Sequence, residues 1–204
     1  MAIQDEKGLK EAWDIYNNRG IKARQLKAQG KKIMGYYCSY PPLEMITAMD
    51  YMPFRVHGSM TESVTKADSN IPTIVCPIIR SSLDLALKGR YDFLDGFVAA
   101  HTCDCEEKFC RIWGHEIKLP FHHYIDMPHV IRGNALDLFK DKLNTLKKAL
   151  EDHTGKQMNP ERLKEEIKIH NLQRALVRKL YRLRKEDPPF LSGSETLKIM
   201  IALM

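Results

Sequence analysis

The stretch Lys32-Ile-Met-Gly-Tyr-Tyr-Cys38 decides the fold class of this chain. Its first six residues form a short, mostly apolar run that predicts a buried strand. Cys38 follows the strand, and Pro41-Pro-Leu-Glu44 then carries the signals of a helix start, with an acidic residue in the first turn. The order is therefore strand, cysteine and helix.

Two later segments repeat this order. Pro72-Thr-Ile-Val-Cys76 is followed by Pro77, a residue that favours the first position of a helix. Gly96-Phe-Val-Ala-Ala100 leads through His101-Thr-Cys103 to a helix that begins at Asp104. Strands that alternate with helices are typical of a parallel sheet, so we predict an α/β fold built on a doubly wound parallel sheet.

Three cysteines follow the predicted strands. In a doubly wound sheet, ligands bind beyond the carboxyl ends of the strands, so loops from that edge bring Cys38, Cys76 and Cys103 together. Each thiol also precedes a helix, whose N-terminal partial charge favours the thiolate over the thiol. The thiolate is the form that binds a metal.

The second half of the sequence is helical, and we divide the chain into residues 1–130 and 131–204. Apolar residues recur at helical spacing over 136–150 and 169–183, after an initial helix predicted over 5–29. Ser192-Gly-Ser-Glu195 is a capping box, and the nine residues after it are mostly apolar. Because nothing after them covers such a helix, we expect a second α/β domain that is missing or is supplied by a partner.

The composition and charge of the chain indicate which partners and which compartment fit it. The 204 residues carry a net charge of +6 and a pI near 9.0, but acidic residues are interleaved among the cations of 162–185. That pattern is typical of a solvated helix face, so we expect no nucleic-acid partner, whereas a small phosphate-bearing substrate fits the charge. The sequence has neither a secretory signal nor an apolar run long enough for a membrane span. Five cysteines without a secretory signal indicate a reducing, cytoplasmic compartment.

The cysteine spacing excludes a zinc ribbon, because the sequence contains no Cys-x-x-Cys pair. Thiolates on separate loops suit an iron–sulfur cluster, and the alternative is that they are ordinary buried residues. Cys105 and Cys110 lie five residues apart on the helix after Cys103, so we expect them to pack rather than bind a metal.

Polar residues near the cysteines have two interpretations. His101, His122 and His123 are candidate ligands, acids or donors to a cluster sulfur, although hydrogen-bonded loop histidines are commoner. Glu44 stands at the predicted sheet edge, where a carboxylate can handle a substrate proton, or can simply stabilise the helix dipole. Arg80 is a candidate partner for a phosphate.

Several blocks resemble a known family across nearly the whole chain. They are Gly35-Tyr-Tyr-Cys-Ser-Tyr-Pro-Pro-Leu-Glu-Met-Ile46, Met52-Pro-Phe-Arg55, Val75-Cys-Pro-Ile-Ile-Arg-Ser-Ser82, Tyr91-Asp-Phe-Leu-Asp-Gly96, His101-Thr-Cys-Asp104 and Pro188-Pro-Phe-Leu-Ser-Gly-Ser-Glu195. In order and spacing they resemble the benzoyl-CoA reductase and 2-hydroxyacyl-CoA dehydratase family. The resemblance implies Rossmann-like α/β domains and an anaerobic enzyme of two homologous subunits that acts on an acyl-CoA substrate.

The resemblance also implies a cofactor and a second protein. In the family, a four-iron four-sulfur cluster lies beside the thioester, and an ATP-dependent iron–sulfur activator supplies a low-potential electron that makes a substrate radical. Cys76 and Cys103 match cluster-ligand positions, Cys38 is a further candidate ligand, and Glu44 matches a position near the substrate. A remaining ligand belongs to a C-terminal domain.

Two alternatives stay open at this point. Cys105 and Cys110 depart from the usual family pattern, which leaves room for a double-cubane cluster and a reductase of small molecules. A chain without the C-terminal domain can also be a truncated, non-catalytic scaffold subunit. Whether the substrate is aromatic or a 2-hydroxyacyl thioester is not decided by the sequence.

Overall fold

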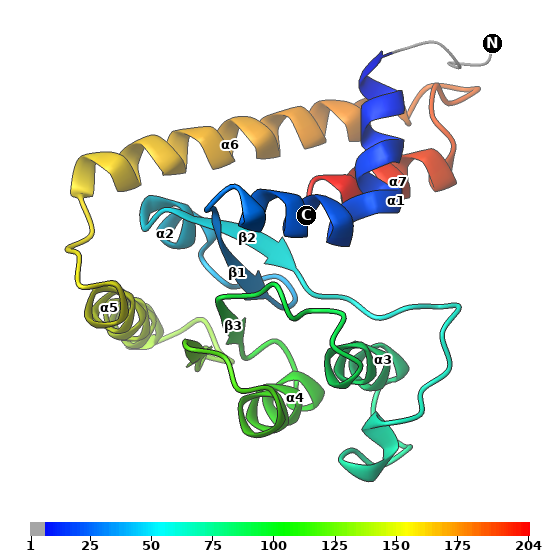
Figure 1. Cartoon of the computed structure of the whole chain (residues 1–204). Helices are drawn as coiled ribbons and strands as arrows, with labels where there is room; N and C mark the ends of the chain where they lie inside the picture. The colour runs from blue at the N-terminus through cyan, green and yellow to red at the C-terminus, as the bar shows by residue number, and fades with distance from the viewer. Residues whose placement is uncertain (1–6) are drawn as a thin grey trace.

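The computed structural model describes residues 7–204, and its centre is a four-stranded parallel sheet in the order β2-β1-β3-β4 (Figure 1). The strands are β1 (Lys32–Tyr36), β2 (Tyr51–Arg55), β3 (Gly96–Ala100) and β4 (His122–Ile125). The register sets Lys32 opposite Tyr51, Met34 opposite Gly96, and Phe97 opposite His122. The predicted α/β fold with a parallel sheet is confirmed.

Helices cover both faces of this sheet. They are α1 (Lys7–Ala28), α2 (Leu43–Ala48), α3 (Pro77–Leu87), α4 (Asp104–Glu116), α5 (Ala135–Thr154), α6 (Pro160–Leu183) and α7 (Gly193–Ala202), with a short 3-10 turn η1 (Ala67–Ser69). Side chains from α1, α3 and α4 share one core with the sheet, and those from α2 and α5 share another. The long α6 packs on α2, and α7 packs on α1 (Figure 1).

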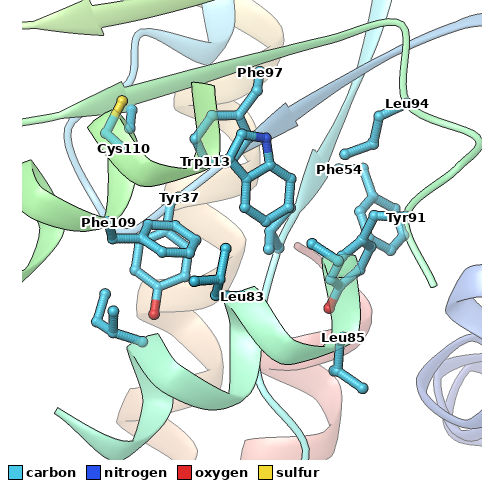
Figure 2. Close-up of a cluster of buried hydrophobic side chains, with 14 of the residues drawn as sticks. Tyr37, Phe54, Leu83, Leu85, Tyr91, Leu94, Phe97, Phe109, Cys110 and Trp113 are labelled. Atoms are coloured by element: carbon cyan, nitrogen blue, oxygen red, sulfur yellow. The ribbon is translucent and has the colours of Figure 1, made fainter. Parts of the chain in front are cut away.

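The central strand β3 shows why the sheet is buried on both faces. Phe97 and Ala99 belong to the core with α3 and α4, whereas Val98 and Ala100 belong to the core with α2 and α5. Successive side chains of a strand point to opposite faces, so an unbroken apolar strand needs a helix layer on each side. Figure 2 shows the first of these cores, where Phe97 stacks on Trp113 with ring centroids 4.5 Å apart.

The predicted strand over 72–75 is wrong. These residues form turns on the surface, and Ile74 is 93% exposed. The place beside β1 is taken by Tyr51–Arg55, which contains Pro53 and so does not look like a strand. Pro53 is tolerated because β2 lies at the edge of the sheet, where a missing N–H leaves no neighbouring carbonyl unpaired.

The stretch 121–128, expected to be a loose connection, contains the fourth strand. His122–Ile125 pairs with β3 from Phe97 to Ala100. The sequence does not predict this strand because it begins with two histidines instead of an apolar run. An edge strand needs apolar residues on one face only, so the histidines are compatible with it. The correction extends the sheet by one strand without changing its class.

The helix ends follow the sequence signals closely. Asn159 caps α6 by accepting hydrogen bonds from the backbone N–H groups of Glu161 and Arg162, and Gly155 ends α5 in the left-handed conformation. The capping box of Ser192 and Glu195 is present at the start of α7. This apolar helix packs on α1, which precedes it in the chain, and Leu197 stays exposed, so the expected second domain remains a prediction. Over residues 7–204, no helix combines the length and apolarity that a bilayer crossing requires.

Candidate functional site

Two of the three predicted ligand cysteines follow strands at the carboxyl edge of the sheet. Cys38 comes two residues after β1, in the left-handed backbone conformation with φ 61°. Cys103 follows β3 and is the residue that caps α4. This edge is where a doubly wound sheet places its ligands.

Cys76 reaches the same edge by another route. It caps α3, which runs back towards the beginning of β3, so the start of this helix lies at the carboxyl edge. Burial raises the pKa of Tyr37, the Ser82 hydroxyl lowers it in part, and Cys76 and Cys38 contribute smaller increases. The prediction that these loops share one edge therefore holds, although no strand precedes Cys76.

The thiols of Cys76 and Cys103 are accessible and lie at helix starts. Both residues are exposed, and Cys38 is half-buried. Neither cap makes a side-chain hydrogen bond to its helix, so these thiols do not bond the free N–H groups of the first turn, which in α3 begin after Pro77. Among residues 7–204, however, no three histidine, cysteine or acidic side chains are close enough to hold one metal ion.

Cys110 has the opposite environment. It is fully buried between α4 and the sheet, beside the aromatic core drawn in Figure 2. Burial raises the pKa of its thiol to about 12, so Cys110 is uncharged at neutral pH. Cys105 is half-buried against the same core. Cys110 packs in the core as predicted, and whether either cysteine binds a metal stays a prediction.

His101 lies between Cys103 and a second histidine that the sequence did not indicate. Its Nδ1 is 3.1 Å from Nε2 of His129 and 3.6 Å from Oδ1 of Asp126. Its Nε2 is buried without a hydrogen-bond partner, since Asp104 is 4.0 Å away. His129 follows β4, the strand that the sequence did not predict, on a loop that passes back over the carboxyl edge.

The carboxyl group of Glu106 lies buried in the first turn of α4, three residues after Cys103. Neither of its oxygens has a hydrogen-bond partner, and burial raises its pKa. Orphaned buried polar atoms are uncommon in native proteins and need an explanation. Nε2 of His101 is a further buried polar atom without a partner. These unpaired atoms therefore belong to residues on both sides of Cys103, around the start of α4.

These observations bear on whether an iron–sulfur cluster fits. The donors are of the right kind, because Cys76 and Cys103 present accessible sulfurs at helix starts, where thiolate is favoured. His101 offers an unpaired ring nitrogen that can donate to a cluster sulfur. The described residues thus fit part of a ligand set, and the remaining ligands have to come from elsewhere.

His122 and His123 lie away from the cysteine edge. They stand at the beginning of β4, which is the opposite end of the sheet from Cys103. Nε2 of His122 is 3.3 Å from the sulfur of Cys110, and burial lowers the pKa of both histidines. The candidate phosphate ligand Arg80 is paired with Asp68 through Nε at 3.0 Å and Nη2 at 2.5 Å.

Glu44 lies at the carboxyl edge, in the first turn of α2, and it already has a partner. Its Oε1 accepts a hydrogen bond from Nη2 of Arg174 on α6 at 2.5 Å. Burial by itself raises the pKa of Glu44, but its own N–H, Arg174 and His170 lower it by more. At neutral pH the side chain is therefore a carboxylate, suited to accept a proton.

Replacing Arg174 by glutamine is expected to raise the pKa of Glu44. The substitution removes the cation that favours the carboxylate and leaves the opposing effect of burial in place. Carbon-detected NMR titration of labelled glutamate measures this shift. Arg178→Gln, which removes an exposed guanidinium from the same helix, is the control. An unchanged Glu44 titration in Arg174→Gln contradicts the assignment of the ion pair.

A pocket of about 710 Å³ opens beside Cys38. It lies between the segment after β2, the start of α3, and the helices α1 and α7. Its apolar wall includes Tyr37, Val56, Met60, Ile78, Leu197 and Ile201. Its polar residues include Arg19, Arg55 and His57, none of which the sequence singled out as a site, because Arg19 comes from α1 and the other two from the end of β2 and the segment after it.

The chain is similar to proteins of one enzyme family. A family model described as 2-hydroxyglutaryl-CoA dehydratase, D-component, matches residues 38–204. A subunit of benzoyl-CoA reductase from Thauera aromatica is 28% identical over 88% of this chain and 48% of its own length. The beta subunit of (R)-2-hydroxyglutaryl-CoA dehydratase from Acidaminococcus fermentans is 27% identical over 86% of the chain and 47% of its length.

A third relative shows a similar identity and a similar coverage. The beta subunit of lactoyl-CoA dehydratase from Anaerotignum propionicum is 26% identical over 88% of this chain and 48% of its own length. The chain thus spans about half the length of the relatives that it matches. All three relatives are named as subunits of enzymes that act on CoA thioesters.

Proposed function

Because the chain belongs to the 2-hydroxyglutaryl-CoA dehydratase D-component family, we propose that it is part of the iron–sulfur subunit of an anaerobic acyl-CoA enzyme. The enzyme is of the benzoyl-CoA reductase or 2-hydroxyacyl-CoA dehydratase type. The observation that carries this proposal is the pair of accessible thiols, Cys76 and Cys103, that precede two helices at the carboxyl edge of the sheet, the edge at which Cys38 lines a pocket.

In this proposal Cys76 and Cys103, with Cys38 as a third candidate, hold a four-iron four-sulfur cluster. The bound cluster supplies one low-potential electron to the acyl-CoA. The helix starts stabilise the thiolates that bind iron, and His101 donates a hydrogen bond towards the cluster from Nε2. Cys110 is left out, because its protonated, buried thiol does not support a double-cubane site.

The other residues bind the substrate and handle its proton. The pocket beside Cys38 is mostly apolar, so a bound acyl group excludes water from the reacting carbonyl. Glu44 accepts a proton as a carboxylate, once the substrate or a neighbouring segment displaces Arg174.

The partners in the proposal are a homologous second subunit and an ATP-dependent iron–sulfur activator. Each of the three relatives carries the name of a subunit rather than of a whole enzyme, and that naming supports a partner subunit. The activator follows from the need for an electron of low potential. Neither nucleic acid nor a membrane is part of the proposal.

Anaerobic purification of the full-length protein, alone and with its partner subunit, tests the cluster. We expect a brown protein with about four iron and four sulfide per chain, the content of one such cluster. A colourless, iron-free protein in both preparations contradicts the proposal. That result instead favours a scaffold subunit that docks on a homologous chain without a cluster of its own.

A further inference from the structure

Two guanidinium groups line the mostly apolar pocket beside Cys38. Arg19 comes from α1 and Arg55 from the end of β2, and both line the pocket. Arg19 is only 8% exposed, which is unusual for a charged side chain. It also lies before residues 38–204, the segment that the family model matches. The family match therefore does not explain it.

The contacts of Arg19 hold the group in place without neutralising it. Nη2 donates a hydrogen bond to the carbonyl oxygen of Arg55 at 3.1 Å, and the guanidinium carbon lies 4.7 Å from the centre of the Phe54 ring. A carbonyl and an aromatic ring attract a cation, but they carry no net charge. Nη1 of Arg55 is 2.9 Å from the sulfur of Met204, which is also uncharged.

Within the described residues 7–204, neither of these two cations forms an ion pair with a carboxylate. Glu62 is the acidic residue on the pocket wall, and both its oxygens lie 3.3 Å from Nη2 of Arg90. Between residues 7 and 204, no acidic oxygen lies within 4.0 Å of the guanidinium nitrogens of Arg19 or Arg55. Burial lowers the pKa of His57, and the two arginines lower it further, so this third polar group is neutral at pH 7.

A buried charge without a counter-charge is costly, and proteins usually pair it. Arg19 is such a charge, and together with the half-buried Arg55 it lines an open cavity of about 710 Å³ that is large enough for a small ligand. We propose that Arg19 and Arg55 form an anion subsite in this pocket, which binds an apolar ligand through one carboxylate or phosphate group. Guanidinium groups bind both anions through paired hydrogen bonds.

This inference rests on the proposed function only for the identity of the ligand. In an acyl-CoA enzyme the anion has two sources, namely a carboxylate at the far end of the acyl chain or a phosphate of the CoA. The apolar wall of the pocket contacts the hydrocarbon part in either case. The subsite itself is independent of iron, and its test needs no cluster.

Isothermal titration calorimetry of the full-length protein with octanoate and octanamide tests the subsite. The two probes share a hydrocarbon chain, and only octanoate is charged. We expect octanoate to bind at least about tenfold more tightly, as charge-assisted hydrogen bonds imply. Arg19→Met and Arg55→Gln should each remove that preference. Arg178→Gln, with the same loss of charge on the exposed face of α6, should keep it.

Arg55→Gln guards against a folding artefact, because Arg19→Met also removes a hydrogen bond to the main chain. The backbone of Arg55 pairs with β1 and with Met204, and this pairing does not depend on the Arg55 side chain. Equal affinity of the wild type for both probes overturns the subsite. So does a preference for octanoate that persists in Arg55→Gln.

Hexanoyl-CoA and adipoyl-CoA distinguish the two sources of the anion. Tighter binding of adipoyl-CoA, lost in Arg19→Met, assigns the subsite to a terminal carboxylate. Equal binding of both thioesters, weakened about tenfold in both variants, assigns it to a CoA phosphate. If the two arginines are needed for the preference for octanoate over octanamide and neither thioester binds, the subsite stands and the acyl-CoA function fails. If both thioesters bind the variants as well as the wild type, the subsite is wrong and the function stands.

Discussion

Alanine at Cys76 or Cys103 is expected to abolish iron binding by the anaerobically purified protein. Both side chains are exposed and lie at helix starts, so each is a ligand that the rest of the fold does not need. Loss of one thiolate leaves an iron site open to solvent, and the cluster dissociates. The iron and sulfide content of the purified variants measures the loss.

Cys110→Ala is the matched control for these variants. Its thiol is buried and protonated, and its removal should lower stability by about 1 kcal/mol while the iron content stays that of the wild type. Circular dichroism should show an unchanged fold for Cys76→Ala and Cys103→Ala. Wild-type iron in both of these variants refutes the ligand assignment, and loss of iron in Cys110→Ala alone refutes it equally.

Asp84→Ala is expected to destabilise the fold by about 3–5 kcal/mol. The Asp84 side chain is buried on α3, and its Oδ1 accepts hydrogen bonds from the backbone N–H groups of Thr65, Lys66 and Ala67. Its Oδ2 pairs with Nζ of Lys88 at 2.5 Å. The substitution leaves three N–H donors without an acceptor and removes the carboxylate partner of Lys88, whose Nζ still donates to the carbonyl oxygen of Ser63. It also frees the segment that leads to Cys76. Urea denaturation measures the change.

The exposed Asp92, which pairs with Arg24 at 2.6 Å, provides the control. Asp92→Ala should cost no more than about 1 kcal/mol, as is usual for surface ion pairs. Asp84→Asn keeps an acceptor oxygen, so its loss of free energy of unfolding should lie between those of Asp84→Ala and Asp92→Ala. A loss below about 1 kcal/mol in Asp84→Ala contradicts the role given to this carboxylate.

Asp84 also predicts how stability depends on pH. Burial alone raises its pKa, but Lys88 and the three N–H groups lower the pKa by more, so it lies well below its usual range. The stabilisation is therefore present above the ordinary aspartate pKa of about 4 and is lost as the pH falls towards the folded-state value. The free energy of unfolding of the wild type should fall steeply below about pH 4. Asp84→Asn should show a flatter curve.

The candidate site is predictable only where it lies next to recognisable local structure. Cys103 follows an apolar strand and precedes an acidic helix start, and the structure places it as the cap of α4. The sequence places Cys76 at the correct sheet edge from an incorrect strand, because Pro77 marks the helix even though residues 72–75 form turns. Helix-start signals are local in sequence, and a strand depends on which neighbour it finds.

The residues that the sequence does not reveal come from distant segments. Arg19 and Arg55 meet because α1 packs beside the end of β2, and His129 meets His101 because the loop after β4 passes over the sheet edge. Glu44 lies at the edge as predicted, but its partner Arg174 lies on a helix 130 residues later. No spacing rule connects such residues, so their pairing is not predictable from a single sequence.

The amino-acid sequence by itself determined the alternation of strands and helices, the caps of α6 and α7, the position of the cysteines at helix starts, and the family. These features depend on hydrophobic periodicity and on hydrogen bonds between residues a few positions apart. Only the tertiary structure decided that Tyr51–Arg55 is the second strand, that Cys110 is a protonated core residue, and that two unpaired arginines face one pocket. Burial and charge pairing depend on contacts between distant segments, which exist only once the chain has folded.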